Sequence, residues 1–232
     1  TRKYSVNSIL LFDFDGTIAL GDGPVLAYAQ HVASVLAEGD DFVDRIRAAL
    51  NGADEEALDG YDAVRRAAER RGASIEQLSA AYLASRAQLA TDAAPISAPE
   101  GLAAFLENAD ALRILVTNAP AIRMEEALEV LGLSGLFDRI IAGAGKPAGL
   151  KLVLEDLPAD ARVLSIGDIW HNDLAPAHAA GHATALVGAF PAPDATPTYC
   201  AAEFSTLIPQ LENWLRASDH TLPHAELTHT EG

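Results

Sequence analysis

From about residue 99 onward, the sequence alternates between short apolar runs and longer stretches with helical spacing. The apolar runs cover residues 113–117, 139–142, 162–167 and 184–187, and each has the length and composition of a buried strand. The stretches predicted to be helical are residues 102–108, 122–131, 150–157, 173–180 and 207–215. This alternation predicts an α/β fold with a parallel sheet and right-handed crossovers. Ligands of such sheets bind at the carboxyl ends of the strands, so the residues after each strand are the candidates for a functional site.

A further strand is predicted near the start of the sequence, at about residues 8–14, and two carboxylates lie at its end. Asp13 and Asp15 are two residues apart, and side chains at this spacing on a strand point to the same side. Gly16 then allows the backbone to turn sharply. Two carboxylates this close need a cation or a shared proton. The pattern has two interpretations, a solvated acidic turn or a metal-assisted site with one carboxylate as nucleophile and one as acid–base group.

The next two strands are followed by groups suited to an anion. Thr117 and Asn118 follow the strand at 113–117, where a hydroxyl and backbone amides can hold a phosphate oxygen or cap the next helix. Lys146 follows the third strand and can supply the cation that a phosphoryl group needs. Lys151 is the competing candidate, although it falls inside a predicted helix.

The strand at 162–167 ends in Gly167-Asp168, and Asp173 follows five residues after Asp168. Gly167 lets the chain turn so that Asp168 can reach the same cation as Asp13, and Mg²⁺ prefers carboxylate oxygens. Asp173 either opens the next helix as an N-terminal carboxylate or joins the metal site. His171 is interpreted as an exposed loop residue, because a Mg²⁺ site rarely uses imidazole.

These four segments occur in the order of the four motifs of the haloacid dehalogenase-like (HAD) hydrolase superfamily, which the chain resembles. Motif I corresponds to Asp-Phe-Asp-Gly-Thr at 13–17, and Lys146 lies 22 residues before Asp168, a spacing close to that of motifs III and IV. The common Lys-Pro-x-Pro form of motif III is Lys-Pro-Ala-Gly here, so the match is looser at Gly149. The resemblance implies a Rossmann-like, doubly wound parallel sheet of about five strands in the order 3-2-1-4-5, with an inserted α-helical cap.

The resemblance also implies a role for each candidate residue. Asp13 would attack phosphorus and become an aspartyl phosphate, and Asp15 would protonate the leaving alcohol and then activate water. The cofactor would be Mg²⁺, held by Asp13, the backbone carbonyl of Asp15, Asp168 and Asp173, the last as a ligand or as a group that orients the ligands. The phosphoryl group would be bound by Thr117, the Asn118 amide and Lys146.

Motif II corresponds to the segment at Thr117 and Asn118. The residues between motifs I and II, about 20–94, have helical spacing and no strand periodicity, and the family places a helical cap at this point in the chain. The expected division is a core of residues 1–19 and 96–218, a cap of residues 20–95, and a disordered polar tail at 219–232. The cap carries seven arginines, of which one or two are candidates for binding a substrate carboxylate or a second phosphate. They are Arg45, Arg47, Arg65, Arg66, Arg70, Arg71 and Arg86.

The formal net charge of -17, from 16 basic and 33 acidic residues, argues against nucleic acid or an anionic membrane as a partner. No apolar run approaches the ~20 residues of a membrane helix, and no basic-then-apolar leader is visible. Cys200 is the single cysteine, and it is interpreted as a small buried residue in a protein of a reducing compartment. A cytoplasmic protein is therefore expected, and the sequence does not indicate its oligomeric state.

Together these features predict a Mg²⁺-dependent phosphatase of a small phosphorylated metabolite, resembling the phosphoglycolate phosphatase-like branch of the superfamily. The dehalogenase branch lacks a second motif I carboxylate, so Asp15 argues against it. The phosphonate-cleaving branch uses a cap lysine, and no lysine lies between Asp15 and Thr117. A phosphomutase on the same scaffold and a catalytically silent binding module remain as alternatives.

Overall fold

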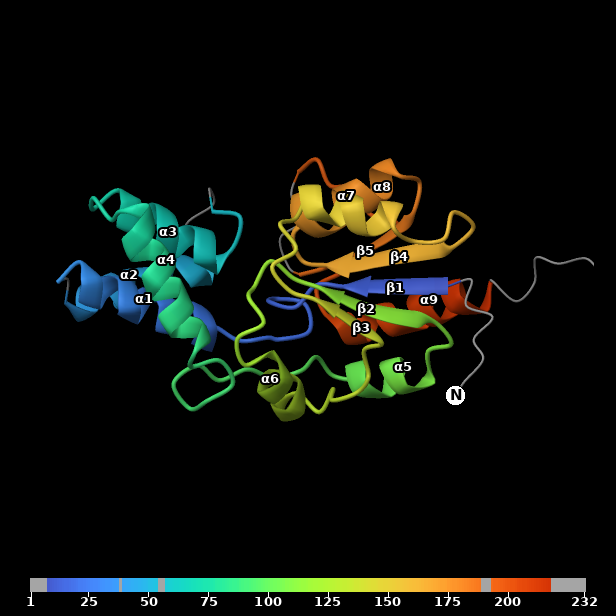
Figure 1. Cartoon of the computed structure of the whole chain (residues 1–232), viewed down its shortest axis with the longest axis horizontal. Helices are drawn as coiled ribbons and strands as arrows, with labels where there is room; N and C mark the ends of the chain where they lie inside the picture. Colours follow the sequence, from blue (N-terminus) through green and yellow to red (C-terminus); the bar gives the residue numbers. More distant parts are fainter. Residues whose placement is uncertain (1–7, 38, 54–56, 189–192, 218–232) are drawn as a thin grey trace, which may run out of the picture.

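The computed structural model in Figure 1 describes residues 8–37, 39–53, 57–188 and 193–217. These residues form a sheet covered by helices on both faces and a separate group of four helices beyond the tips of the strands. None of the helices in these ranges is long and apolar enough to cross a membrane. The tail 219–232, which was predicted to be disordered, lies outside the described residues, and so do residues 1–7 of the predicted core.

The described strands form one parallel sheet of six strands in the order β3-β2-β1-β4-β5-β6. They are β1 (Ser8–Phe12), β2 (Leu112–Val116), β3 (Arg139–Ile141), β4 (Arg162–Gly167), β5 (Ala183–Val187) and β6 (Tyr199–Ala201). The order of the first five strands confirms the prediction. The sixth strand was not predicted. It pairs with β5 at the edge of the sheet, and Cys200 on it is exposed, so the prediction of a buried cysteine was wrong.

Strand β1 lies at the centre of the sheet and is buried on both faces. Leu10 and Phe12 pack against helices on one face, and Ile9 and Leu11 pack against the other, as expected for side chains that alternate along a strand. Figure 1 shows α7 and α8 on one side of the sheet and α5 and α9 on the other. The helices around the sheet are α5 (Leu102–Asn108), α6 (Met124–Val130), α7 (Ala148–Glu155), α8 (Ala175–Ala179) and α9 (Phe204–Arg216).

The register of the central strands brings their carboxyl ends to one edge. Phe12, the last residue of β1, lies opposite Leu115 of β2 and Ile166 of β4. The backbone N–H of Asp13 continues this ladder and donates to the carbonyl of Ile166 at 2.9 Å. The segments that follow these strands therefore start side by side.

The helices α1 (Gly23–Val35), α2 (Asp40–Ala48), α3 (Gly60–Glu69) and α4 (Ile75–Arg86) have a hydrophobic cluster of their own. The predicted capping box of α4 is present, with Ser74 and Gln77 each bonding the other's backbone. The chain passes from the sheet to these helices and back through two adjacent segments, in which Leu20 and Ser97 exchange backbone hydrogen bonds of 2.8 and 2.9 Å.

Candidate active site

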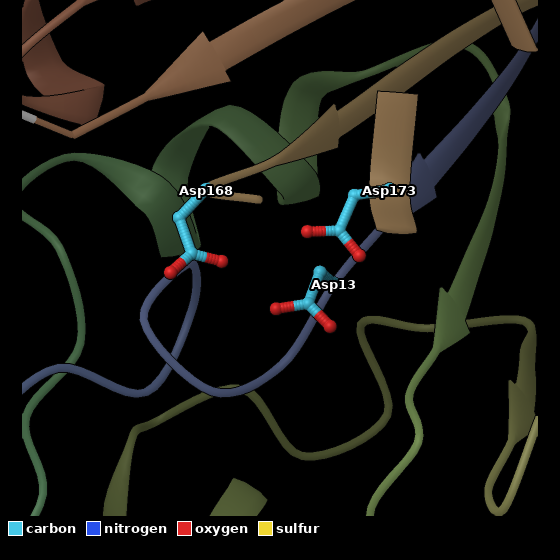
Figure 2. Close-up of side chains that lie close together, drawn as sticks. All are labelled: Asp13, Asp168 and Asp173. Carbon is cyan, nitrogen blue, oxygen red and sulfur yellow. The ribbon is translucent and has the colours of Figure 1, made fainter. Parts of the chain in front are cut away.

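Three carboxylates meet at the carboxyl edge of the sheet, and Figure 2 shows them facing a common space. Asp13 follows β1, Asp168 follows β4, and Asp173 lies in a π-helical turn at Trp170–Leu174. Each provides an oxygen within 4.8 Å of the other two. The close approach of Asp13 and Asp168 that the sequence led us to expect is therefore present.

The ammonium group of Lys146 lies between two of these carboxylates. Its Nζ donates to Asp13 Oδ1 at 2.5 Å and to Asp173 Oδ1 at 2.6 Å, and the lysine is 9% exposed. Burial lowers the pKa of Lys146, but the two carboxylates more than offset this, so its pKa is raised and the group stays charged. The competing candidate, Lys151, is exposed on α7. Lys146 is therefore the lysine of this site.

The electrostatics of the cluster favour an added cation. Burial and then repulsion by Asp173 raise the pKa of Asp13 to about 7, despite the neighbouring Lys146. Burial also raises the pKa of Asp168 well above its usual range, and repulsion by Asp13 adds to the shift. A divalent cation relieves such repulsion, and the buried carboxylate oxygens are the donors that Mg²⁺ prefers. The residues present therefore fit the predicted Mg²⁺.

The turn after β1 brings a glycine and a threonine against this cluster. Gly16 has a φ of +81°, and a Cβ built on it would lie 2.3 Å from Asp168 Oδ2, so a side chain here would displace that carboxylate. Thr17 Oγ1 is fully buried, 3.2 Å from Asp13 Oδ2 and 3.3 Å from Asp168 Oδ1. A hydroxyl has one proton, so it donates to one of the two at a time. The sequence analysis gave Thr17 no role, although this hydroxyl is part of motif I.

The residues after β2 differ in part from expectation. Helix α6 begins only at Met124, so Thr117 does not cap it, and the amides beside Thr117 belong to a loop rather than to a helix end. Thr117 Oγ1 instead accepts a hydrogen bond from the Ala119 N–H at 3.0 Å. The Asn118 side chain bonds the backbone of Lys146 on both sides, accepting from its N–H at 2.6 Å and donating to its carbonyl at 3.3 Å. Asn118 thus fixes the position of Lys146, a role that the sequence analysis missed.

Asp173 is held from several directions. Its Oδ2 accepts from the Ile169 N–H at 3.0 Å, and its backbone carbonyl accepts from the Ser165 hydroxyl at 2.6 Å. A Cβ built on Gly167 would lie 2.4 Å from the Asp173 Cβ, so glycine is required for this close approach. Asp173 lies before α8 rather than opening a regular helix, and it orients Lys146 as well as facing the other two carboxylates.

The Asp15 side chain points away from the carboxylate cluster and toward α3 and α4. Its Oδ1 accepts from Arg86 Nη1 at 2.8 Å and from the Tyr61 hydroxyl at 3.2 Å. Burial, and then the charge of Asp15, raise the pKa of Tyr61 well above 10, so the phenol keeps its proton. Arg86 is 1% exposed and its guanidinium carbon lies 5.7 Å from the centroid of the Phe14 ring. These contacts connect the helices to the turn after β1.

A cavity of about 180 Å³ opens at this point between the sheet edge and the helices. On the sheet side it is lined by Asp13, Asp15, Thr117, Asn118, Ala119, Lys146, Ile169, Asn172 and Asp173, and on the helix side by Asp59, Tyr61 and Tyr82. The structure therefore brings the predicted catalytic and phosphate-binding residues to one cavity. Asp168 is not among the lining residues, but its carboxylate lies near that of Asp13.

The fold recurs in solved structures of HAD proteins. YfnB from Bacillus subtilis, assigned as a HAD hydrolase and solved with magnesium bound, matches with a TM-score of 0.60 and 19% identity over 90% of this chain and 100% of its own. A HAD phosphatase from Thermococcus onnurineus matches with a TM-score of 0.53 and 17% identity, covering 88% of this chain and 97% of its own. An assigned phosphoglycolate phosphatase from Haemophilus somnus has a TM-score of 0.60 and 16% identity, with coverages of 88% and 97%.

At these identities the solved structures establish the fold alone. A comparison with curated protein sequences gives no match. The sequence model of the haloacid dehalogenase-like hydrolases, in contrast, matches residues 8–181, which contain all four motifs. The chain therefore belongs to the haloacid dehalogenase-like hydrolase family.

Proposed function

We propose that the protein is a Mg²⁺-dependent phosphatase that hydrolyses a small phosphorylated metabolite through an aspartyl phosphate on Asp13. The observation that carries this proposal is the cluster of Asp13, Asp168 and Asp173, whose oxygens lie within 4.8 Å of one another, with Lys146 bonded to both Asp13 and Asp173. A nucleophile, a metal-binding carboxylate and a fixed cation are what phosphoryl transfer needs in one place. Membership of a hydrolase family with phosphatases among its structural relatives adds support.

In the first half of the reaction, an Asp13 oxygen attacks phosphorus and the bond to the leaving alcohol breaks. Asp15 lines the same cavity and gives a proton to the departing oxygen. Lys146, Thr117 and the Asn118 amide stabilise negative charge on the phosphoryl oxygens. Mg²⁺ would be held by Asp13, the Asp15 carbonyl and Asp168, with Asp173 as a ligand or orienting group, and it would supply positive charge that offsets the negative charge of the transition state.

In the second half, Asp15 takes a proton from a water molecule that attacks the aspartyl phosphate. The P–O bond to Asp13 breaks, inorganic phosphate leaves, and Asp13 is regenerated as a carboxylate. Because Arg86 and Tyr61 bond Asp15 Oδ1, its Oδ2 is the oxygen that carries the proton in both steps.

We also propose that residues 20–95 act as a cap on a core of residues 1–19 and 96–218. The separate hydrophobic cluster of α1 to α4 and the paired connections at Leu20 and Ser97 support this division. The cap excludes water from the cavity and selects the leaving group, since Asp59, Tyr61 and Tyr82 line it.

The test is hydrolysis of acetyl phosphate and p-nitrophenyl phosphate by the purified chain, with Mg²⁺ and with EDTA. We expect phosphate release that needs the metal, and loss of turnover in Asp13→Asn. Asp160→Asn, which makes the same change at an exposed position, is the matched control and should behave as the wild type. Easily measured turnover in Asp13→Asn would refute its role as nucleophile. A lasting requirement for a bisphosphate activator would instead identify a phosphomutase, and no turnover of any ester would identify a silent binding module.

A further inference from the structure

The cap side of the cavity is negatively charged. Among the residues that the structure describes, this side is lined by Asp59, Tyr61 and Tyr82, none of which is a lysine or an arginine. On the sheet side, Lys146 is the one cation among the lining residues that the structure describes, and two carboxylates hold it. Any part of a substrate that extends from the phosphoryl group toward the cap therefore meets a carboxylate and two phenols.

The cap arginines do not change this charge pattern. Arg86 approaches the site most directly and pairs with Asp15 through Nη1, but it does not line the cavity, and its Nε and Nη2 are buried without a hydrogen-bond partner among the described residues. None of the seven arginines lines the cavity in the described part of the chain, which does not support the expectation that one or two bind a substrate anion. Arg45, Arg70 and Arg71 line a separate hollow between α2 and α3, while Arg47, Arg65 and Arg66 lie 2.5–4.0 Å from acidic side chains of their own helices.

Asp59 is fixed in place by its role at the start of α3. As the N-cap residue, its Oδ1 accepts from the Asp62 N–H at 2.7 Å, which aims the carboxylate at the cavity wall. Burial raises the pKa of Asp59, and the charges of Asp62 and Asp15 add to this. A ligand that donates hydrogen bonds or carries positive charge would relieve this cost, whereas an anionic ligand would increase it.

We propose that the substrate is a small phosphate monoester whose leaving alcohol carries hydroxyl or ammonium donors and no carboxylate or second phosphate, with Asp59 as the group that recognises it. This inference rests on the proposed phosphatase function. The cavity of about 180 Å³ is smaller than the ~300 Å³ or more of pockets for drug-sized ligands, so the alcohol has only a few heavy atoms beyond the ester oxygen. A second anion in that space would face Asp59 and Asp15 without a free cation among the described lining residues.

The test compares kcat/KM for esters of similar size. Glycerol phosphate and ethanolamine phosphate present donors, whereas phosphoglycolate, phosphoglycerate and propanediol bisphosphate present a second anion. We expect both donor esters to be preferred by about tenfold or more, the effect of one unfavourable charge contact. Acetyl phosphate, which has no such group, reports the chemistry independently of the cap.

Asp59→Asn separates recognition from folding, because asparagine caps a helix as well as aspartate does. The preference for ethanolamine phosphate over phosphoglycolate should fall about tenfold in this variant. Asp62→Asn is the matched control, since it removes the same charge three residues away, outside the cavity lining, and should leave the preference unchanged. A loss confined to the ethanolamine ester identifies an ammonium as the donor that Asp59 recognises, and an equal loss for the glycerol ester identifies a hydroxyl.

Two results would overturn the inference while leaving the phosphatase proposal intact. One is hydrolysis of acetyl phosphate together with a preference for any of the three compounds that carry a second anionic group. The other is an Asp59→Asn variant whose substrate preference equals that of the wild type. Failure to hydrolyse acetyl phosphate and every ester would refute the phosphatase proposal itself, and this inference with it.

Discussion

Replacing Lys146 by methionine tests the arrangement on which the proposed chemistry depends. Methionine has a similar length and fills the same space, but it carries no charge. The lysine side chain is 4% exposed, and its ammonium contacts Asp13 and Asp173 at 2.5 and 2.6 Å. The variant therefore leaves two buried carboxylates close together without their shared cation. Lys151→Met is the matched control, because Lys151 lies exposed on α7.

The size of the effect follows from the burial of the pair. Removing one partner of a buried ion pair costs about 3–5 kcal/mol, and an exposed substitution changes stability by about 0.5 kcal/mol or less. For a chain of this size each kcal/mol corresponds to about 2–4 °C in Tm. Lys146→Met should therefore lower Tm by about 6–20 °C, and Lys151→Met by about 2 °C at most.

Thermal melting and urea unfolding followed by circular dichroism, in buffer without Mg²⁺, measure this difference. Added Mg²⁺ should restore part of the lost stability in Lys146→Met, because a cation bound to Asp13 and Asp168 offsets some of the unpaired charge. Phosphatase activity at saturating Mg²⁺ should fall by about 10²–10³, as for removal of one preorganised donor to the transition state. Equal Tm values for the two lysine variants would refute the buried bridge, and equal activities would refute the role of Lys146 in phosphoryl transfer.

Three further predictions follow from other contacts. Gly149→Ala should destabilise the protein by about 2 kcal/mol or more in urea unfolding, because the added Cβ would lie 1.6 Å from the Ala144 carbonyl oxygen. Thr17→Val should weaken the apparent Mg²⁺ affinity in activity titrations by about 10–100-fold, since it removes the hydroxyl that contacts the two carboxylates proposed to bind the metal. Asp138→Asn should cost about 1–3 kcal/mol at pH 7, because the carboxylate accepts from Arg113 Nε, Nη2 and N–H at 3.0, 3.0 and 2.8 Å. Burial opposes ionisation of Asp138, but the hydrogen bonds from Arg113 outweigh burial and lower the pKa of Asp138. The stability that these bonds provide is therefore present above about pH 4. Below that pH, the difference between the variant and the wild type in urea unfolding should shrink.

The sheet could be predicted from the sequence because its central strands are continuous apolar runs. Strand β1 is buried at every position, and its pattern gave its location to within two residues of the observed Ser8–Phe12. The strand β6 could not be found in this way. It has three residues, Tyr199–Ala201, of which Cys200 is exposed, and its pairing with β5 is a tertiary contact that leaves no local apolar run.

The departure from the Lys-Pro-x-Pro form at Gly149 has a local cause that only the structure shows. The Gly149 N–H donates to the Gly145 carbonyl at 2.9 Å, which a proline could not do. The neighbouring Ala144 carbonyl also occupies the space of any side chain at this position. The loop that carries Lys146 is therefore closed by glycine, and the weaker motif match does not weaken the placement of the lysine beside Asp13.

The roles of side chains that hold other site residues in place were harder to predict than the roles of side chains that line the cavity. The Asn118 backbone amide was expected to contact phosphate, but its side chain holds the backbone of Lys146, 28 residues away in sequence. Thr17 was visible within motif I, yet a hydroxyl after two aspartates gives no sign of which oxygen it will reach. These contacts depend on how β2 pairs with β3 and how β1 pairs with β4, and no local pattern specifies those registers.

Because local patterns do not specify tertiary contacts, the residues that follow strands were easier to predict from the sequence than the contacts made by the inserted helices. The core residues follow strands, so parallel pairing brings them together wherever the strands lie in the sequence. The helices α3 and α4 reach the site through side chains on their faces instead. Tyr61 and Arg86 bond Asp15, from which they are separated by 46 and 71 residues in the sequence. Helical spacing indicates that a face is buried, but not which ion a buried arginine will meet. Arg86 bonds Asp15 through Nη1 and is not among the residues that line the cavity, and its buried Nε and Nη2 have no hydrogen-bond partner in the described part of the chain. Among the described lining residues, Asp59 is therefore the charged group that the segment 20–95 brings to the cavity, and the number of arginines in that segment does not by itself indicate an anion site.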